Sequence, residues 1–501
     1  MNLARLMMID LSGSRLTADE REFLSQRRPG GVCLFARNVV DRFQLADYVQ
    51  ELRSLAGSEL IVAVDQEGGG VVRVTDLPYP PGAMALGAAD DVALTRAVAA
   101  ATGHGLRSVG IDVDFAPVAD VNSNPANPVI ADRSFGSDPE LVSRHVVAFV
   151  QGLQGAGVGA TVKHFPGHGD AAVDSHLALP TLDLSLEELE RREWPPFVAA
   201  FEAGVAAVMT AHIVMPRIDP DFPGTLSRKV MTGLLRERLG FDGVVFTDAL
   251  EMKAIAGKWG GAEAAVLALK AGVDMPVQVA SLRLQEETIA AIERAMAEGR
   301  LDQQALAVSA RRLARLHSQH LVDPGGAWRE GDAALLDEAA GRALVMLGGD
   351  LPRVRPGDRV VLVAAQATRQ SAATQATVSP ASGLAAALRE RGVDVVEVRY
   401  QPDEASSLLA EVPATDLVVF ASTARTVLQE GEVELARRLA RGAGSGRFIH
   451  VALWNPYLVN DLPGPALVAF GWRERSIRAV AAALMGEVRA SAEAPVDLAT
   501  A

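Results

Sequence analysis

Short, continuously apolar segments recur through the first two thirds of the chain, and a longer segment with helical spacing of apolar residues follows most of them. A strand that is apolar throughout has to be covered on both faces, as parallel strands of α/β proteins are. Regular alternation of such strands with helices therefore predicts a parallel α/β fold. The expected strands cover residues 7–11, 31–35, 60–65, 113–118, 160–165, 206–212, 244–248 and 273–279.

Eight strands of this kind predict a closed (β/α)8 barrel. In a barrel, the carboxyl ends of the strands form the rim that carries the chemistry. An open doubly wound sheet would instead gather its polar residues at one switch point. Polar side chains spread over several strand ends therefore favour the barrel and predict its functional face. These side chains are Asp65, Asp120, Lys163 with His164, His212 and Asp248.

Two segments between the expected strands carry helix-boundary signals. Ser185 followed by Glu188 is the pattern of a capping box, in which each side chain binds the other residue's backbone amide. Ser227 precedes a segment with Val230 and Leu234 on one face, and Gly240 closes that segment. Both patterns predict helices.

The chain of 501 residues is longer than one hydrophobic core usually supports, so we expect two domains. We predict a barrel over residues 1–325, a linker over 326–340 that is rich in Pro, Gly and charge, and a smaller open α/β sandwich over 341–501. The second domain contains no GxGxxG or P-loop sequence, so no nucleotide is assigned to it. Its expected strands cover residues 359–364, 393–398, 417–421, 448–453 and 466–470.

Composition excludes several classes of partner. A net charge of −14 argues against nucleic acid, because phosphate binding needs a concentrated basic face. The chain has no run of about 18 apolar residues, so a membrane span is not expected. Asp10 interrupts the first apolar stretch, so we expect no signal peptide and a cytoplasmic protein. The single cysteine, Cys33, lies in an apolar stretch and is interpreted as a buried small hydrophobe.

The densest polar cluster is KHFPGHGD at residues 163–170, with DSH at residues 174–176 behind it. Three histidines and two aspartates suggest a metal site. Lys163 argues against it, because it would place a positive charge beside the cation, and the HExxH spacing is absent. His164 or His168 could individually brace the loop. Bracing explains the whole cluster poorly, because burying many ionisable groups is costly without a function.

Three further positions could carry chemistry. Asp248, in GVVFTDALEM, would point into the barrel mouth, or it would cap a helix that begins at Ala249. The residues alone leave both interpretations open. Asp65 in VDQEGG, with Arg73 after it, and Arg133 in DRSFG suit a hydroxyl-rich ligand with bidentate contacts. Each of these could singly be an ordinary surface ion pair.

The motifs VDQEGG, DRSFG, KHFPGHGD with DSH, and FTDALEM, in this order, resemble glycoside hydrolase family 3. The DSH loop is similar to that of the family's bacterial β-N-acetylglucosaminidase branch. GGVCLFARN, NPYLV and VAFGW extend the resemblance over nearly the whole chain. It implies a barrel followed by a sandwich domain. One departure is Gly70, where the family commonly has arginine, which puts in doubt a local contact near the barrel rim.

The resemblance also implies a retaining mechanism without cofactor or metal. Asp248 would be the nucleophile and His176 the acid/base, with Asp174 orienting it. An imidazole suits this role because its ordinary pKa lies near neutrality. The ligand would be a small carbohydrate. By resemblance, the residues that bind the terminal N-acetylglucosamine are Asp65, Arg73, Arg133, Lys163 and His164.

The reaction that the resemblance favours is removal of terminal β-linked N-acetylglucosamine, in the turnover of cell-wall fragments such as peptidoglycan recycling. A phosphorylase of the same fold is the first alternative, since an imidazole would not repel incoming phosphate as a carboxylate would. A catalytically inactive sugar-binding protein is the second. β-Glucosidase and β-xylosidase activities are disfavoured because those branches lack the DSH loop. In some relatives the second domain sends a residue into the active site, and the sequence identifies none here. It assigns no oligomeric state.

Overall fold

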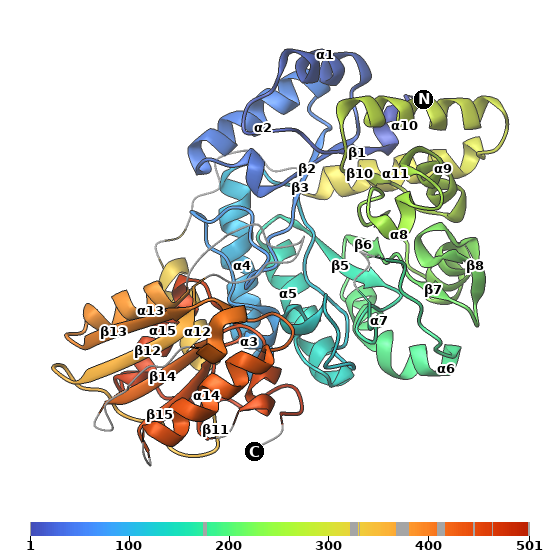
Figure 1. Ribbon diagram of the computed structural model, residues 1–501. Helices are drawn as coiled ribbons and strands as arrows, with labels where there is room; N and C mark the ends of the chain where they lie inside the picture. The colour runs from blue at the N-terminus through green and yellow to red at the C-terminus, as the bar shows by residue number, and fades with distance from the viewer. Residues whose placement is uncertain are drawn as a thin grey trace.

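The computed structural model describes residues 2–173, 178–320, 329, 331–366, 380–407, 416–443, 446–462 and 464–498. These residues form two bodies, each built around its own sheet. The first body, coloured from blue to yellow-green in Figure 1, contains the N-terminal strands and their helices. The second, in orange and red, contains the C-terminal sheet. Within the described residues no helix is long and apolar enough to cross a bilayer.

The first sheet is a parallel barrel of eight strands, in the order β10-β1-β2-β3-β4-β5-β6-β9. A parallel bridge between Phe246 and Met275 joins β9 to the segment before β10, which closes the ring. The fold prediction and all eight expected strands are confirmed, although most are shorter than predicted. The strands are β1 (Met8–Ile9), β2 (Gly31–Leu34), β3 (Ile61–Val64), β4 (Val113–Asp114), β5 (Gly159–Phe165), β6 (Ala207–Thr210), β9 (Val244–Phe246) and β10 (Val277–Gln278).

Helices surround this barrel. The predicted capping box is present, because the Ser185 hydroxyl accepts from the amide of Glu188 and the Glu188 carboxylate accepts from the amide of Ser185. The helix expected after Ser227 is a π-helix, Lys229–Arg238. The α-helices are α1 (Ala18–Arg27), α2 (Arg42–Ala56), α3 (Ala83–Ala89), α4 (Val92–Ser108), α5 (Pro139–Gly155), α6 (Leu186–Glu188), α7 (Pro195–Glu202), α8 (Lys253–Ala256), α9 (Gly261–Ala271), α10 (Leu282–Ala297) and α11 (Gln303–His320).

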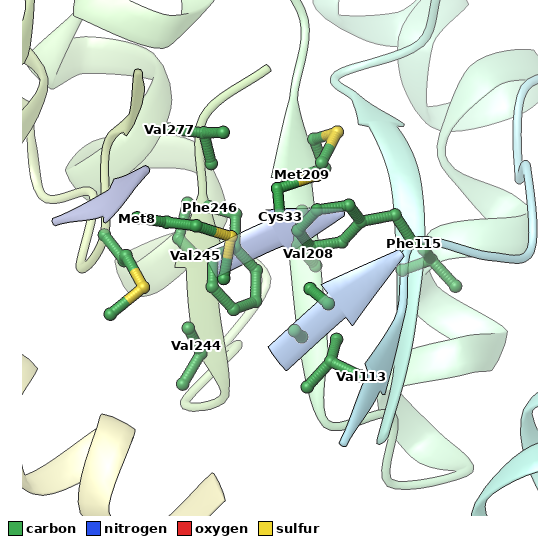
Figure 2. Packing of buried hydrophobic residues seen from close by; sticks show 14 of the residues in the cluster. Met8, Cys33, Val113, Phe115, Val208, Met209, Val244, Val245, Phe246 and Val277 are labelled. Carbon is green, nitrogen blue, oxygen red and sulfur yellow. The ribbon is translucent and has the colours of Figure 1, made fainter. Parts of the chain in front are cut away.

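Side chains fill the interior of the barrel, so it is a packed core and not a pore. Phe115, Met209 and Phe246 come from different strands and meet in the space that the strands enclose (Figure 2). The rings of Phe115 and Phe246 pack edge to face with their centroids 5.3 Å apart. Cys33 is buried among them, and burial raises the pKa of its thiol, so its predicted role as a small hydrophobe is confirmed.

The second sheet has six strands in the order β11-β16-β15-β14-β12-β13, and β11 alone is antiparallel to its neighbour. Helices α12, α13 and α15 cover one face and α14 covers the other, so the predicted sandwich is confirmed. The elements are α12 (Asp332–Arg342), β11 (Val345–Leu347), β12 (Arg359–Ala365), α13 (Pro380–Arg389), β13 (Asp394–Tyr400), β14 (Leu417–Ser422), α14 (Glu430–Gly442), β15 (Phe448–Ala452), β16 (Ala466–Val468) and α15 (Glu474–Leu484).

Three strands were not expected. The hairpin of β7 (Val214–Met215) and β8 (Asp219–Pro223) follows β6, and β8 contains the sequence DPDFP, which is typical of a turn and not of a strand. Strand β11 has three residues, of which only the first is buried, so it carries no strand pattern. The predicted domain boundaries stay predictions, because residues 321–328 lie outside the described residues. Helix α12 begins inside the expected linker.

A buried carboxylate, Asp274, ties together three elements at the amino end of the barrel strands. It accepts hydrogen bonds from the amide of Val245 at 2.9 Å and from the Ser309 hydroxyl at 2.7 Å. Arg236 lies 2.6 Å away and Arg312 lies 3.3 Å away. One side chain therefore joins β9, the π-helix and α11.

Asp274→Ala should lower the free energy of unfolding by about 3–5 kcal/mol, because two half-buried guanidinium groups lose the buried carboxylate that they share. The matched control is Asp242→Ala, since exposed Asp242 also pairs with Arg312 but costs less than about 1 kcal/mol to remove. Urea unfolding followed by circular dichroism measures both. Equal losses in the two variants would contradict the role of Asp274.

Candidate active site

A cavity of about 280 Å³ lies at the carboxyl ends of the barrel strands. Cys33, Phe115 and Met209, which belong to the barrel core, also line it. Every described residue that the sequence predicts for the site lines this cavity: Asp65, Arg73, Arg133, Lys163, His164 and Asp248. The structure thus brings these residues together at one cavity, and their predicted roles stay predictions.

Lys163, on β5, is the buried cation of the site. Its ammonium lies 2.8 Å from Asp65 Oδ1, and Arg73 Nη2 lies 3.3 Å from Asp65 Oδ2. Burial alone would raise the pKa of Asp65, but Lys163 and Arg73 outweigh burial and hold that pKa below its ordinary value. Burial likewise opposes the charge of Lys163, and its two acidic neighbours, Asp65 and Glu67, raise the pKa of its ammonium.

Glu67 is a site residue that sequence reasoning missed. Its carboxylate lies 2.5 Å from the ammonium of Lys163 and takes a bidentate pair of 2.8 Å hydrogen bonds from Arg133. Burial raises the pKa of Glu67, but Arg133 and Lys163 together lower it well below its ordinary value. The sequence offers one signal for Glu67, its position two residues after Asp65. Side chains two residues apart in an extended chain point to the same side.

His164 is oriented by the buried carboxylate of Asp120. Asp120 Oδ2 lies 2.7 Å from His164 Nδ1, and Asp120 also accepts from the amides of His164 and His168. Against the effect of burial, the neighbouring His164 lowers the pKa of Asp120. Arg133 Nη2 lies 3.4 Å from His164 Nε2 and can only donate, so Nε2 is the acceptor. Asp120 thereby fixes both the tautomer and the direction of the ring.

His168 is buried beside His164, with the two ring centroids 5.8 Å apart, and it also lines the cavity. Burial lowers the pKa of its imidazole to about 4, so it is neutral at physiological pH. A neutral, buried ring supports the interpretation that His168 belongs to the structure of this loop. Within the described ranges no group of three or more His, Cys, Asp or Glu side chains could hold a metal ion.

Asp248 follows β9 and faces the cavity. Its Oδ1 accepts from the amide of Ala249 at 2.8 Å, but the next helix, α8, begins only at Lys253. The alternative that Asp248 caps a helix starting at Ala249 is therefore wrong. His212, expected at the rim, lies behind this turn, with its Nε2 3.0 Å from the carbonyl of Ala249.

Glu251 is a second carboxyl group on the same turn. Its Oε2 accepts from the amide of Val279 at 3.1 Å, and the side chain lines the same cavity as Asp248. Burial, with a smaller contribution from the charge of Asp248, raises the pKa of Glu251 to about 8. The cavity thus contains one acid that is protonated at neutral pH, beside Asp248. His176 and Asp174 lie outside the described residues, so their predicted roles stay predictions.

Comparison with known proteins extends the resemblance over the whole chain. A β-hexosaminidase from Methylococcus capsulatus is 43% identical over 276 residues, covering 54% of this chain and 81% of the relative. Beta-hexosaminidase A from Pseudoalteromonas piscicida is 37% identical over 327 residues, covering 60% of this chain and about half, 54%, of the relative. The structure of a family 3 β-N-acetylglucosaminidase from Paenibacillus sp. str. FPU-7 superimposes with a TM-score of 0.91 at 33% identity, covering 100% of this chain and 99% of that one.

The barrel and sandwich domain of this chain superimpose over their whole length on a family 3 β-N-acetylglucosaminidase, and together with the similarity to the β-hexosaminidases this defines the chain as a glycoside hydrolase. The sequence model for the Glycosyl hydrolase family 3 N terminal domain matches residues 1–316. The chain therefore belongs to glycoside hydrolase family 3, and the family resemblance is confirmed.

Glu251→Gln should change how stability depends on pH. The pKa of Glu251 is raised in the folded state, so the unfolded chain loses this proton first as pH rises from about 4.5 to about 8. The wild-type protein therefore loses stability over this range relative to the variant. Unfolding midpoints of both proteins at pH 5 and pH 8 measure this difference, and the subtraction removes effects of other acids. A difference that is the same at both pH values would show that Glu251 is ionised at neutrality.

Proposed function

We propose that the protein is a retaining exo-glycosidase that removes terminal β-linked N-acetylglucosamine. The observation that carries the proposal is the position of Asp248, which faces the same cavity as the ion-paired cluster of Lys163, Glu67 and Arg133. The names of the relatives, β-hexosaminidase and β-N-acetylglucosaminidase, support the choice of sugar. Fragments of the bacterial cell wall are the proposed natural substrates.

The size of the cavity supports removal of a single terminal sugar. Ligand pockets usually enclose roughly 300–1,000 Å³, and this one encloses about 280 Å³. A pocket just below this range suits one sugar ring. The charged groups that ring it offer both kinds of hydrogen-bonding partner: Lys163 and Arg133 donate, and Asp65 accepts. A ring bearing several hydroxyl groups needs both.

In the proposed first step, a carboxylate oxygen of Asp248 forms a bond to the anomeric carbon. The bond from that carbon to the leaving oxygen breaks, and the leaving oxygen takes a proton from a general acid. In the second step, water gives a proton to the same group and displaces Asp248. The amide of Ala249, at 2.8 Å, holds the orientation of the nucleophile before the substrate arrives.

The proposed general acid is His176, with Asp174 orienting its ring. A second candidate is Glu251, because its carboxyl group is protonated at neutral pH and lies in the cavity of Asp248. Retaining glycosidases ordinarily pair a carboxylate nucleophile with a carboxylic acid of raised pKa. Either candidate would donate the same proton in the same reaction, so variants of His176 and of Glu251 distinguish them.

The purified protein should hydrolyse an aryl β-N-acetylglucosaminide much faster than the matching β-glucoside. Asp248→Ala should lower this rate more than about a thousandfold, because no other group replaces the nucleophile. Added azide should restore part of the turnover by occupying the space that the carboxylate leaves. Circular dichroism controls for folding of the variant.

Three outcomes of this assay would contradict the proposal. A sugar phosphate formed when phosphate is added would identify a phosphorylase. Sugar binding without turnover would identify an inactive binding protein. A rate in Asp248→Ala above a few per cent of the wild-type rate would place the nucleophile elsewhere.

His176→Ala should lose about a hundredfold or more of kcat/KM on a natural disaccharide but less than about tenfold on an activated aryl glycoside. The reason is that a poor leaving group needs a proton in the first step and a nitrophenolate does not. Asp174→Ala should show the same dependence more weakly, and the two losses should not add. Glu251→Gln is the comparison: if it shows the dependence on leaving group and His176→Ala does not, Glu251 is the acid.

A further inference from the structure

Arg473, from the second domain, binds the backbone of a loop that carries site residues. It stands immediately before α15, and its Nε donates to the carbonyl of Gly69 at 2.6 Å. Its Nη2 donates to the carbonyl of Gly70 at 3.3 Å. The guanidinium also lies 5.8 Å from the ring centroid of Tyr79 and 4.9 Å from that of Trp472. These contacts hold the side chain in one direction.

The loop that Arg473 contacts is folded tightly beside Glu67. Gly68 and Gly69 both have positive φ angles, of 97° and 52°. A Cβ atom at Gly69 would lie 2.9 Å from the Cα of Gly82, so the close approach requires glycine there. Glycine restrains its own backbone weakly. Backbone hydrogen bonds between Gly68 and Val71 and from the amide of Gly69 to the carbonyl of Pro80 hold this loop, and the contacts of Arg473 to the carbonyls of Gly69 and Gly70 add to them.

Arg425, also from the second domain, makes the corresponding contact on the neighbouring loop. It lies in the segment after β14, and its Nη2 donates to the carbonyl of Val129 at 2.9 Å. Arg133 donates to the same oxygen at 3.2 Å, and Val129 lines the cavity. The Asn455 side chain holds the Arg425 segment through its backbone carbonyls, at 2.9 and 2.7 Å.

These contacts enclose one ion pair. Glu67 and Arg133 stand on two different barrel loops and join them through their bidentate pair. We propose that Arg473 and Arg425 are positioning residues, which fix the backbone beside Glu67 and beside Arg133 and so set the geometry of the sugar-binding cluster. The second domain is then a working part of the site without touching the sugar. The kinetic test of this inference rests on the proposed function, because it measures glycoside hydrolysis.

The alternative is that the two arginines only hold the domains together. Arg475 provides a matched control for this alternative. Its guanidinium also lies 5.8 Å from the ring centroid of Tyr79, and it binds the carbonyl of Ala333 at 3.0 Å and the carboxylate of Asp337. Arg475→Met thus removes a cation from the same interface, two residues from Arg473, and leaves the hydrogen bonds of Arg473 to the glycine loop in place.

Arg473→Met should raise KM for the aryl glycoside roughly tenfold and change kcat less than about threefold, because it loosens groups that bind the sugar in ground and transition states alike. Arg473→Lys should recover part of this loss, because its ammonium group can still donate to one of the two carbonyls. Arg475→Met should change KM less than about twofold. In a Glu67→Gln background, Arg473→Met should have a smaller effect, because both act through the same loop.

Amide hydrogen exchange gives a readout that needs no activity. Peptides covering residues 66–74 should exchange faster in Arg473→Met than in Arg475→Met, while the unfolding midpoints of the two variants stay similar. Equal exchange in the two variants, equal KM values, or additive effects with Glu67→Gln would each overturn the positioning role. If the wild-type protein hydrolyses no glycoside, the proposed function fails, and the exchange experiment still decides the role of Arg473.

Discussion

The buried ammonium of Lys163 is the constraint on which the rest of the site depends. A cation removed from water needs close anionic partners, and Lys163 has two, Asp65 and Glu67, which both belong to the loop after β3. Two carboxylates two residues apart lie on the same side of an extended chain, so both reach the one ammonium, and the loop turns only after Glu67. Gly68 and Gly69 permit that turn with their positive φ angles. Two carboxylates beside one ammonium would repel each other, and one guanidinium group beside each of them, Arg73 at Asp65 and Arg133 at Glu67, offsets this repulsion.

The buried carboxyl groups around this cluster are either ionised or neutral, and the charges of their neighbours decide which of the two states each group has. Asp65, Glu67 and Asp120 have cationic or imidazole partners, and these partners lower their pKa values against the effect of burial. Asp114 lies beneath the cluster without such a direct partner, and burial raises its pKa to about 8, as it does for Glu251. Permanently ionised and neutral carboxyl groups therefore coexist in one cavity, which is the arrangement that nucleophile and acid roles require.

Local patterns made the barrel and most of its site predictable from sequence. Continuous apolar runs mark strands that are covered on both faces, and the barrel places every strand end at one rim, so Asp65, Lys163 and Asp248 converge without further information. Partnerships between loops leave no such pattern. Glu67 could be quoted in a motif but not paired with Arg133, which lies 66 residues away. Arg473 lies 404 residues from Gly69, and nothing local to either residue indicates the contact.

In the proposed site, charged side chains surround an uncharged sugar. These side chains can be buried there because they form ion pairs and hydrogen bonds with one another. A sugar hydroxyl both donates and accepts, so a site that binds it needs donors and acceptors held in fixed positions. Here the donors of Lys163 and Arg133 already bind Asp65 and Glu67 before any ligand is present. An ammonium has three donors and each carboxylate has about four acceptor positions, so these pairs keep capacity that a hydroxyl group can use. Binding can then displace water from groups that are already in place, and the pairs themselves do not have to break. This preorganisation depends on the geometry of the two loops, and under the proposed function it is what the positioning role proposed for Arg473 and Arg425 would maintain.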